Sequence, residues 1–102
     1  AGFVPVRKPG KLPGDVYTQT FSLEYGDETL AVHTDAIMPG SKVLVIDDVL
    51  ATGGTVGATA ALINRLGAEL IHVSVLLELS FLGGRAHLAG LGIQDTSAVL
   101  TV

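Results

Sequence analysis

One stretch of the chain decides its fold: Val43-Leu44-Val45-Ile46-Asp47-Asp48-Val49-Leu50-Ala51-Thr52-Gly53-Gly54-Thr55. Its first four residues are apolar and mostly β-branched, which is typical of a strand buried on both faces in a parallel sheet. Two carboxylates follow, and a glycine-rich turn then leads into a helical pattern. Because ligands in open α/β sheets bind beyond the carboxyl ends of the strands, this stretch predicts a binding site as well as a strand.

The segments around this stretch show strand and helix periods in turn. Residues 17–25 alternate between apolar and polar side chains, with a break only at Gln19, and a tight turn joins them to a second alternating segment as an antiparallel hairpin. Thr55 is the expected N-cap of a helix that stops at Gly67. The other expected elements are strands at 3–6, 28–33, 70–77 and 98–102 and a weaker helix at 82–91.

This order predicts an α/β fold, with an open, mainly parallel sheet flanked by helices and an antiparallel lid hairpin. We expect a single domain over residues 1–102, in which residues 8–33 form a flexible loop and the lid hairpin. One strong and one weak helix are too few to cover both faces of a parallel sheet. The chain also begins without methionine, and both ends read as strands, so we expect a fragment of a larger fold.

Composition narrows the functional classes. The 102 residues are 48% hydrophobic and 16% charged, which favours a folded core over disorder. The net charge of −4 argues against broad nucleic-acid binding, and no apolar stretch approaches the roughly 20 residues of a membrane helix. The chain has no cysteine, which fits a reducing compartment, so the cytoplasm is the expected location.

The glycine turn has the chemistry of a phosphate site. Gly53 and Gly54 let the backbone approach an anion closely, and the free N–H groups and dipole of a helix start favour negative charge. Thr52 and Thr55 add hydroxyl donors. The turn has no lysine and lacks the G-x-G-x-x-G spacing, which excludes an ordinary P-loop and a dinucleotide fingerprint and favours a monophosphate.

Asp47 and Asp48 precede the turn, where sugar hydroxyls attached to such a phosphate would lie. Carboxylates accept hydrogen bonds from hydroxyls, so the whole stretch predicts a ribose 5-phosphate site. The structural alternative is a tight turn with glycines chosen for packing and with solvated aspartates. Against it, adjacent carboxylates after a buried strand repel each other, and a structural role does not require that repulsion.

These residues resemble a known family. Residues 43–55 resemble the phosphoribosyl pyrophosphate motif of type I phosphoribosyltransferases. Two further segments are similar to the adenine phosphoribosyltransferases: Arg7-Lys8-Pro9-Gly10-Lys11-Leu12-Pro13 and Leu23-Glu24-Tyr25-Gly26. The resemblance covers essentially the whole chain. It implies transfer of a 5-phosphoribosyl group from phosphoribosyl pyrophosphate to adenine, giving AMP and pyrophosphate in purine salvage, with Mg²⁺ present.

The resemblance also implies a role for each motif residue. Asp47 and Asp48 would hold the ribose hydroxyls and steady positive charge at the anomeric carbon, which is a preorganised electrostatic effect. Mg²⁺ binds mainly through substrate oxygens and water, so no dedicated protein cage is expected. The 5′-phosphate would bind the turn residues Ala51, Thr52, Gly53, Gly54 and Thr55.

Residues before the glycine turn have implied roles as well. The basic loop residues Arg7, Lys8 and Lys11 would screen the pyrophosphate, whereas without the resemblance they read equally well as a solvated charge cluster. Glu24 would handle a proton at the base, and its alternative is an exposed strand glutamate. Tyr25 would order the lid or simply pack.

The base pocket and the partners complete what the resemblance implies. Val49 and Leu79 correspond to residues that line the base pocket, although each alone reads as ordinary core. Small-molecule substrates and a second copy of the chain, in a homodimer, are the implied partners. In the family an N-terminal hood and a pyrophosphate loop complete the site, and both would precede Ala1. The three histidines have no metal-ligand spacing and are assigned no chemistry.

Two other functions stay open. A regulatory module that senses phosphoribosyl pyrophosphate would keep the sugar-phosphate site without catalysis, yet it has no need of the basic loop or of Glu24. A phosphoribosyltransferase for another purine, such as xanthine, would carry the same motifs. The sequence before Ala1 is the observation that would separate the bases.

Overall fold

The computed structural model describes residues 4, 6, 15–23, 26–35 and 37–102. Arg7, Lys8, Lys11, Glu24 and Tyr25 therefore lie outside the described residues. In chain order the elements are β1 (Val16–Leu23), β2 (Gly26–His33), β3 (Lys42–Leu50), α1 (Gly54–Arg65), β4 (Glu69–Glu78), the short 3₁₀ helix η1 (Ser80–Leu82), α2 (Gly84–Gly90) and β5 (Thr96–Thr101).

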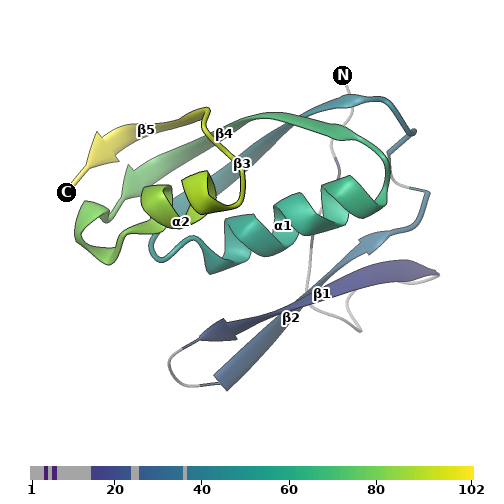
Figure 1. The fold of residues 1–102 in the computed structure, drawn as a ribbon, viewed down its shortest axis with the longest axis horizontal. Helices are drawn as coiled ribbons and strands as arrows, with labels where there is room; N and C mark the ends of the chain where they lie inside the picture. Colours follow the sequence, from purple (N-terminus) through teal and green to yellow (C-terminus); the bar gives the residue numbers. More distant parts are fainter. Residues whose placement is uncertain (1–3, 5, 7–14, 24–25, 36) are drawn as a thin grey trace.

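The central layer is a parallel sheet with strand order β3-β4-β5. The helices α1 and α2 lie together along one face of this sheet, as Figure 1 shows. Helix α1 connects β3 to β4 and α2 connects β4 to β5, so each helix is the crossover between neighbouring parallel strands. The predicted open, mainly parallel α/β sheet is confirmed.

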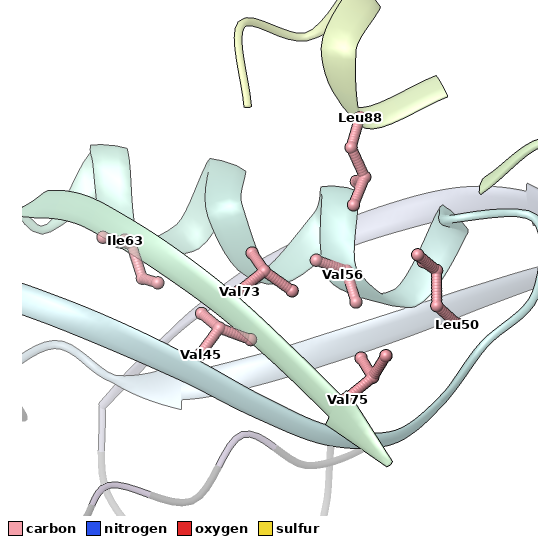
Figure 2. Close-up of a cluster of buried hydrophobic side chains, with 7 residues drawn as sticks. All are labelled: Val45, Leu50, Val56, Ile63, Val73, Val75 and Leu88. Carbon is pink, nitrogen blue, oxygen red and sulfur yellow. The ribbon is translucent and has the colours of Figure 1, made fainter. Parts of the chain in front are cut away.

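The core lies between the parallel sheet and its helices. Val45 on β3 and Val73 and Val75 on β4 point toward α1, where they meet Val56 and Ile63 (Figure 2). These five side chains are all at most 9% exposed. The predicted apolar stripe of α1 is thus confirmed in its packing against the sheet. Leu50 and Leu88 close the same cluster at the carboxyl end of β3 and on α2.

The antiparallel hairpin β1-β2 packs on the other side of α1, away from the parallel sheet (Figure 1). Val32 on β2 meets Leu62 and Leu66 in a second buried cluster. Arg65 adds polar contacts, because its Nη1 donates to the carbonyl of Thr18 at 2.7 Å and its guanidinium lies 4.5 Å from the centre of the Tyr17 ring. Helix α1 is therefore covered by the sheet on one side and by the hairpin on the other.

The face of the parallel sheet opposite the helices is uncovered within the described chain. The strand register and the pleat place four apolar side chains on that face: Leu44, Ile46, Leu76 and Val99, which are 50%, 74%, 61% and 79% exposed. The expectation that β3 is buried on both faces is therefore wrong for this chain. Its apolar run is typical of a strand that lies between two layers, and the described residues form one of these layers.

The strand expected at 3–6 differs from the structure. At 3–6, the described residues Val4 and Val6 are not in a strand and pack instead against the cluster around Val32. The other two residues of this segment lie outside the described residues. The strand expected at 17–25 is β1, which ends at Leu23. Among the described residues, no helix is long and apolar enough to cross a bilayer.

Candidate active site

Asp47 and Asp48 lie inside β3 rather than after it. Parallel pairing with β4 continues through Asp47 opposite Val75 to Leu50 opposite Glu78, so the ladder carries the strand beyond its apolar run. The expectation that the two aspartates directly follow the strand is therefore wrong, because pairing with β4 includes this part of the chain. Both carboxylates nevertheless lie in the carboxyl-terminal part of β3, at the edge of the sheet where α/β proteins bind ligands.

The two carboxyl groups are electrostatically coupled. Asp47 is partly buried and its Oδ1 accepts the backbone N–H of Asp48 at 2.8 Å, while Oδ1 of Asp48 accepts the N–H of Val49 at 2.8 Å. Burial raises the pKa of Asp47, and the neighbouring Asp48 carboxyl raises it further. The hydrogen bond from the backbone N–H of Asp48 lowers this pKa, but by less than burial raises it. The contribution of Asp48 to this shift has the direction that repulsion between adjacent carboxylates produces.

Helix α1 begins two residues earlier than expected. Gly53 is the N-cap, with φ 89° and ψ 2°, and its carbonyl accepts the N–H of Gly57 at 2.8 Å. The predicted N-cap at Thr55 is wrong, because the turn needs a left-handed residue, which glycine adopts at least cost, and the helix starts immediately after it. Thr55 lies in the first turn, where it is exposed.

The start of α1 has the properties of an anion site. The first N–H groups of a helix, here those of Gly54, Thr55 and Val56, have no intrahelical acceptor, and the helix dipole adds partial positive charge. The first turn contains no acidic side chain that would compete for these donors. Thr52 is exposed beside Gly53, so its hydroxyl is available as well. The arrangement suits a phosphate group.

A cavity of about 440 Å³ adjoins this turn. Its wall combines Thr52 and Gly54 of the turn with Gln19 and Phe21 of β1 and with His87 of α2. Sequence reasoning did not place Gln19 or His87 here. The only signal was that Gln19 interrupts the apolar alternation of its strand, which is consistent with a polar side chain beside a binding turn.

Three further predicted site residues are among the described residues and lie at the same edge of the sheet: Val49, Ala51 and Leu79. Val49 pairs with Leu77 and is 37% exposed, and the N–H of Leu79 donates to the carbonyl of Leu50 at 2.9 Å. Ala51 follows directly and is partly buried. The site residues predicted from β3 to the start of α1, together with Leu79, are thus brought to one edge. Within the described ranges, no group of three or more histidine, cysteine, aspartate or glutamate side chains is arranged to hold a metal ion.

Fold and site together define a class of protein: an open parallel α/β sheet with two carboxylates and a glycine-capped helix start at its carboxyl edge. The phosphoribosyl transferase domain family model matches residues 4–87, and the chain belongs to this family.

Three individual proteins carry the comparison further. The adenine phosphoribosyltransferase of Cutibacterium acnes is 70% identical over 102 residues, which are all of this chain and 58% of that protein. A crystal structure of adenine phosphoribosyltransferase from Rhodothermus marinus superposes with a TM-score of 0.93 at 47% identity, covering 100% of this chain and 57% of that one. The APRTase of Giardia lamblia, complexed with 9-deazaadenine, superposes with a TM-score of 0.91 at 40% identity, covering 99% and 57%. The chain thus spans somewhat more than half of each relative's length.

Proposed function

We propose that this chain carries the sugar-phosphate part of the active site of an adenine phosphoribosyltransferase. The observation that supports the proposal most directly is the run from Asp47 to Thr55, in which a coupled carboxylate pair precedes a helix start that is free of acidic residues. The 70% identity to the Cutibacterium acnes enzyme supports adenine as the base. We do not favour the sensing module or another purine, because no structural feature supports either.

The proposed reaction exchanges one bond at the anomeric carbon of phosphoribosyl pyrophosphate. The bond to the pyrophosphate oxygen breaks and its electron pair leaves with the pyrophosphate. A ring nitrogen of adenine forms the new bond and gives up its proton, so the products are AMP and pyrophosphate. The protein must hold the 5′-phosphate, stabilise positive charge on the ribose, accept the proton and screen the leaving group.

The described residues suit the first two of these tasks. The N–H groups after Gly53 and the hydroxyls of Thr52 and Thr55 would hold the phosphate, with Ala51 and Gly54 shaping the turn. Asp47 and Asp48 would accept the ribose hydroxyls, and their fixed negative charge would stabilise the positive charge that develops as pyrophosphate departs. The raised pKa of Asp47 is consistent with a carboxylate that gains stability when a cationic centre forms beside it.

The other tasks are proposed for residues outside the described ranges. Glu24 would accept the proton from adenine, and Arg7, Lys8 and Lys11 would neutralise the pyrophosphate, with Tyr25 ordering the loop. Their support is the similarity of their segments to those of the adenine enzymes. Val49 and Leu79, at the edge of the sheet, would contact the base.

Mg²⁺ fits the donor chemistry of this site. The edge offers carboxylate and hydroxyl oxygens, which are the donor type that this hard cation accepts. The ion would be held by substrate oxygens and water, with Asp47 and Asp48 acting on it only through the substrate and not as direct ligands. When bound, it would neutralise charge on the pyrophosphate. We further propose a homodimer in the cytoplasm, supported by the family resemblance and by a sequence without cysteine.

The test is a comparison of bases in the complete enzyme that contains residues 1–102, with phosphoribosyl pyrophosphate and Mg²⁺ supplied. We expect AMP and pyrophosphate to form with adenine and little product with xanthine or hypoxanthine. Binding of phosphoribosyl pyrophosphate without turnover of any base would support the sensing module instead. Turnover of xanthine in preference to adenine would assign the site to the other purine.

A further inference from the structure

An ion pair at the carboxyl end of β4 has no role in the reaction derived above. Glu78 is the last residue of β4 and is only 5% exposed. Both of its carboxylate oxygens accept from Arg85 of α2, one from Nη2 at 2.7 Å and the other from Nε at 3.1 Å. The third guanidinium nitrogen, Nη1, donates to the carbonyl of Thr96 at 2.6 Å. Arg85 thereby joins the end of β4, the start of β5 and the start of α2.

The residue before Arg85 contacts the glycine turn. A Cβ on Gly84 would overlap the carbonyl oxygen of Ala51 and would lie 3.0 Å from Leu50. From the opposite direction, a Cβ on Gly53 would lie 3.0 Å from the carbonyl oxygen of Gly84. The backbone of the first turn of α2 is therefore packed against residues 50–53. The glycine turn rests on this helix start, and its shape depends on where the helix start is held.

We propose that Glu78 and Arg85 are positioning residues, which hold the first turn of α2 against residues 50–53 and thereby fix the N–H groups at the start of α1 for a sugar phosphate. The inference rests on the proposed function, because it concerns the same phosphate site. Neither residue touches the sugar phosphate in this assignment. They act through Gly84, which lies between the ion pair and the turn.

The geometry of the pair suits orientation more than stability. A bidentate guanidinium and carboxylate fix each other's plane, and here the plane is also tied to the Thr96 carbonyl. The Glu78 side chain is 7% exposed and the Arg85 side chain 47% exposed. A partly exposed ion pair contributes little to stability, whereas its fixed geometry specifies one arrangement. Of the seven residues of helix α2, only Gly84 and Leu88 are buried, so a restraint on its first turn adds to a small packing contact.

Titration with ribose 5-phosphate tests the proposal, with the amide resonances of residues 53–55 as the reporters. Wild-type protein should bind with shifts at these amides. Arg85→Ala should weaken binding about tenfold or more, because small displacements of a preorganised site are costly, and Arg85→Lys, which keeps the charge but loses the fork, should lie between. Ile63→Val is the matched control, since it is a mild deletion in the same core, and its affinity should equal that of wild type.

A second variant acts on the other end of the same contact. Gly84→Ala leaves the ion pair in place but directs a methyl group at the Ala51 carbonyl. If both variants act through one contact, the double variant should lose clearly less binding free energy than the two single variants lose when their losses are added. Strictly additive losses of binding free energy would overturn the proposal.

The outcomes separate this inference from the proposed function. If wild-type protein shows no shift at residues 53–55 with ribose 5-phosphate, the proposed function itself fails. If wild type binds and folded Arg85→Ala binds equally well, the phosphate site stands and the positioning role is wrong. Glu78→Gln covers the case in which Arg85→Ala does not fold, because it keeps the shape of the side chain while removing its charge. Wild-type affinity in folded Glu78→Gln would equally overturn the role.

Discussion

The imidazole of His87 lies against Gly53, the residue that caps α1: a Cβ on Gly53 would be 3.1 Å from Cδ2 of His87 and 3.0 Å from the Gly84 carbonyl oxygen. Gly53 is therefore glycine for two independent reasons. Its φ of 89° belongs to the left-handed region, and α2 leaves no room for a side chain. The left-handed conformation of Gly53 and its close contact with α2 together fix the direction of the N–H groups at the start of α1.

Gly53→Ala should separate these two reasons when compared with Gly40→Ala. Gly40 has a similar φ of 85°, but a Cβ there meets no atom within 4 Å, so its substitution measures backbone strain alone. We expect about 1–2 kcal/mol of lost stability for Gly40→Ala and a larger loss for Gly53→Ala. Urea unfolding of both variants gives the difference. Equal losses would mean that His87 and Gly84 yield without cost.

In the complete enzyme, replacing Asp47 or Asp48 by alanine should lower kcat by about 10²–10³ while the fold survives, by analogy with the loss of one preorganised electrostatic group. Both side chains are at the edge of the sheet and neither belongs to the buried core. The measurement is steady-state AMP formation beside thermal unfolding. Wild-type turnover in either folded variant would show that its carboxylate is not needed to stabilise the ribose cation.

Glu78 should make stability depend on pH in the acid range. The Arg85 guanidinium lowers the pKa of Glu78 below its ordinary value of 4.5. The contribution of the pair is therefore complete above about 4.5 and is lost as pH falls through the lower folded value. Because Asp47 has a raised pKa and acts in the opposite direction, the wild-type curve alone is ambiguous.

Comparison of wild type with Arg85→Ala isolates the Glu78 contribution. We expect the stability difference between the two proteins to be larger at pH 6 than at pH 3 in urea unfolding, because protonated Glu78 gains less from the guanidinium. Arg65→Ala, which removes an arginine with no carboxylate partner among the described ion pairs, is the control and should give a difference with less pH dependence. A pH-independent difference for Arg85→Ala would contradict the assignment.

The parts of the fold that were predictable are those that depend on local pattern. The apolar run before Asp47, the helical spacing up to Gly67 and the alternation around Gln19 each appear within one short segment, and β3, α1 and the hairpin form there. The limits of β3 were not predictable in this way. Pairing with β4 extends the strand to Leu50, so two aspartates that have poor strand propensity are held in the ladder by their neighbour.

The candidate site also has a part that was predictable from local sequence and a part that was not. Residues 47–55 are contiguous, so sequence alone brought them together, whereas the Gln19 and His87 walls of the cavity and the Glu78–Arg85 pair come from other elements. Their approach to the turn depends on how α2 and the hairpin pack against α1. A single sequence contains no direct signal of such long-range contacts, and only the polar residue in an apolar alternation marked one of them.

The uncovered face of the sheet should make the chain of residues 1–102 self-associate. Leu44, Ile46, Leu76 and Val99 form an apolar strip across three strands, and contiguous exposed apolar surface drives association. Sedimentation velocity over a range of concentrations should show species larger than the monomer. The double variant Ile46→Lys with Val99→Lys should shift the distribution toward monomer. Each apolar side chain withdrawn from an interface is worth about 1.5–3 kcal/mol, so the association constant should fall by more than about tenfold.

Met38→Lys is the control for this prediction, because Met38 is 77% exposed, close to the 74% of Ile46, but lies in the turn before β3 and not on the sheet. Its match is the single variant Ile46→Lys, which adds the same charge and removes a comparable apolar side chain. If the strip is the contact surface, Met38→Lys should leave the association constant unchanged. An effect as large as that of Ile46→Lys would attribute association to charge or general surface hydrophobicity. A wild-type chain that stays monomeric at every concentration would contradict the role of the uncovered face outright.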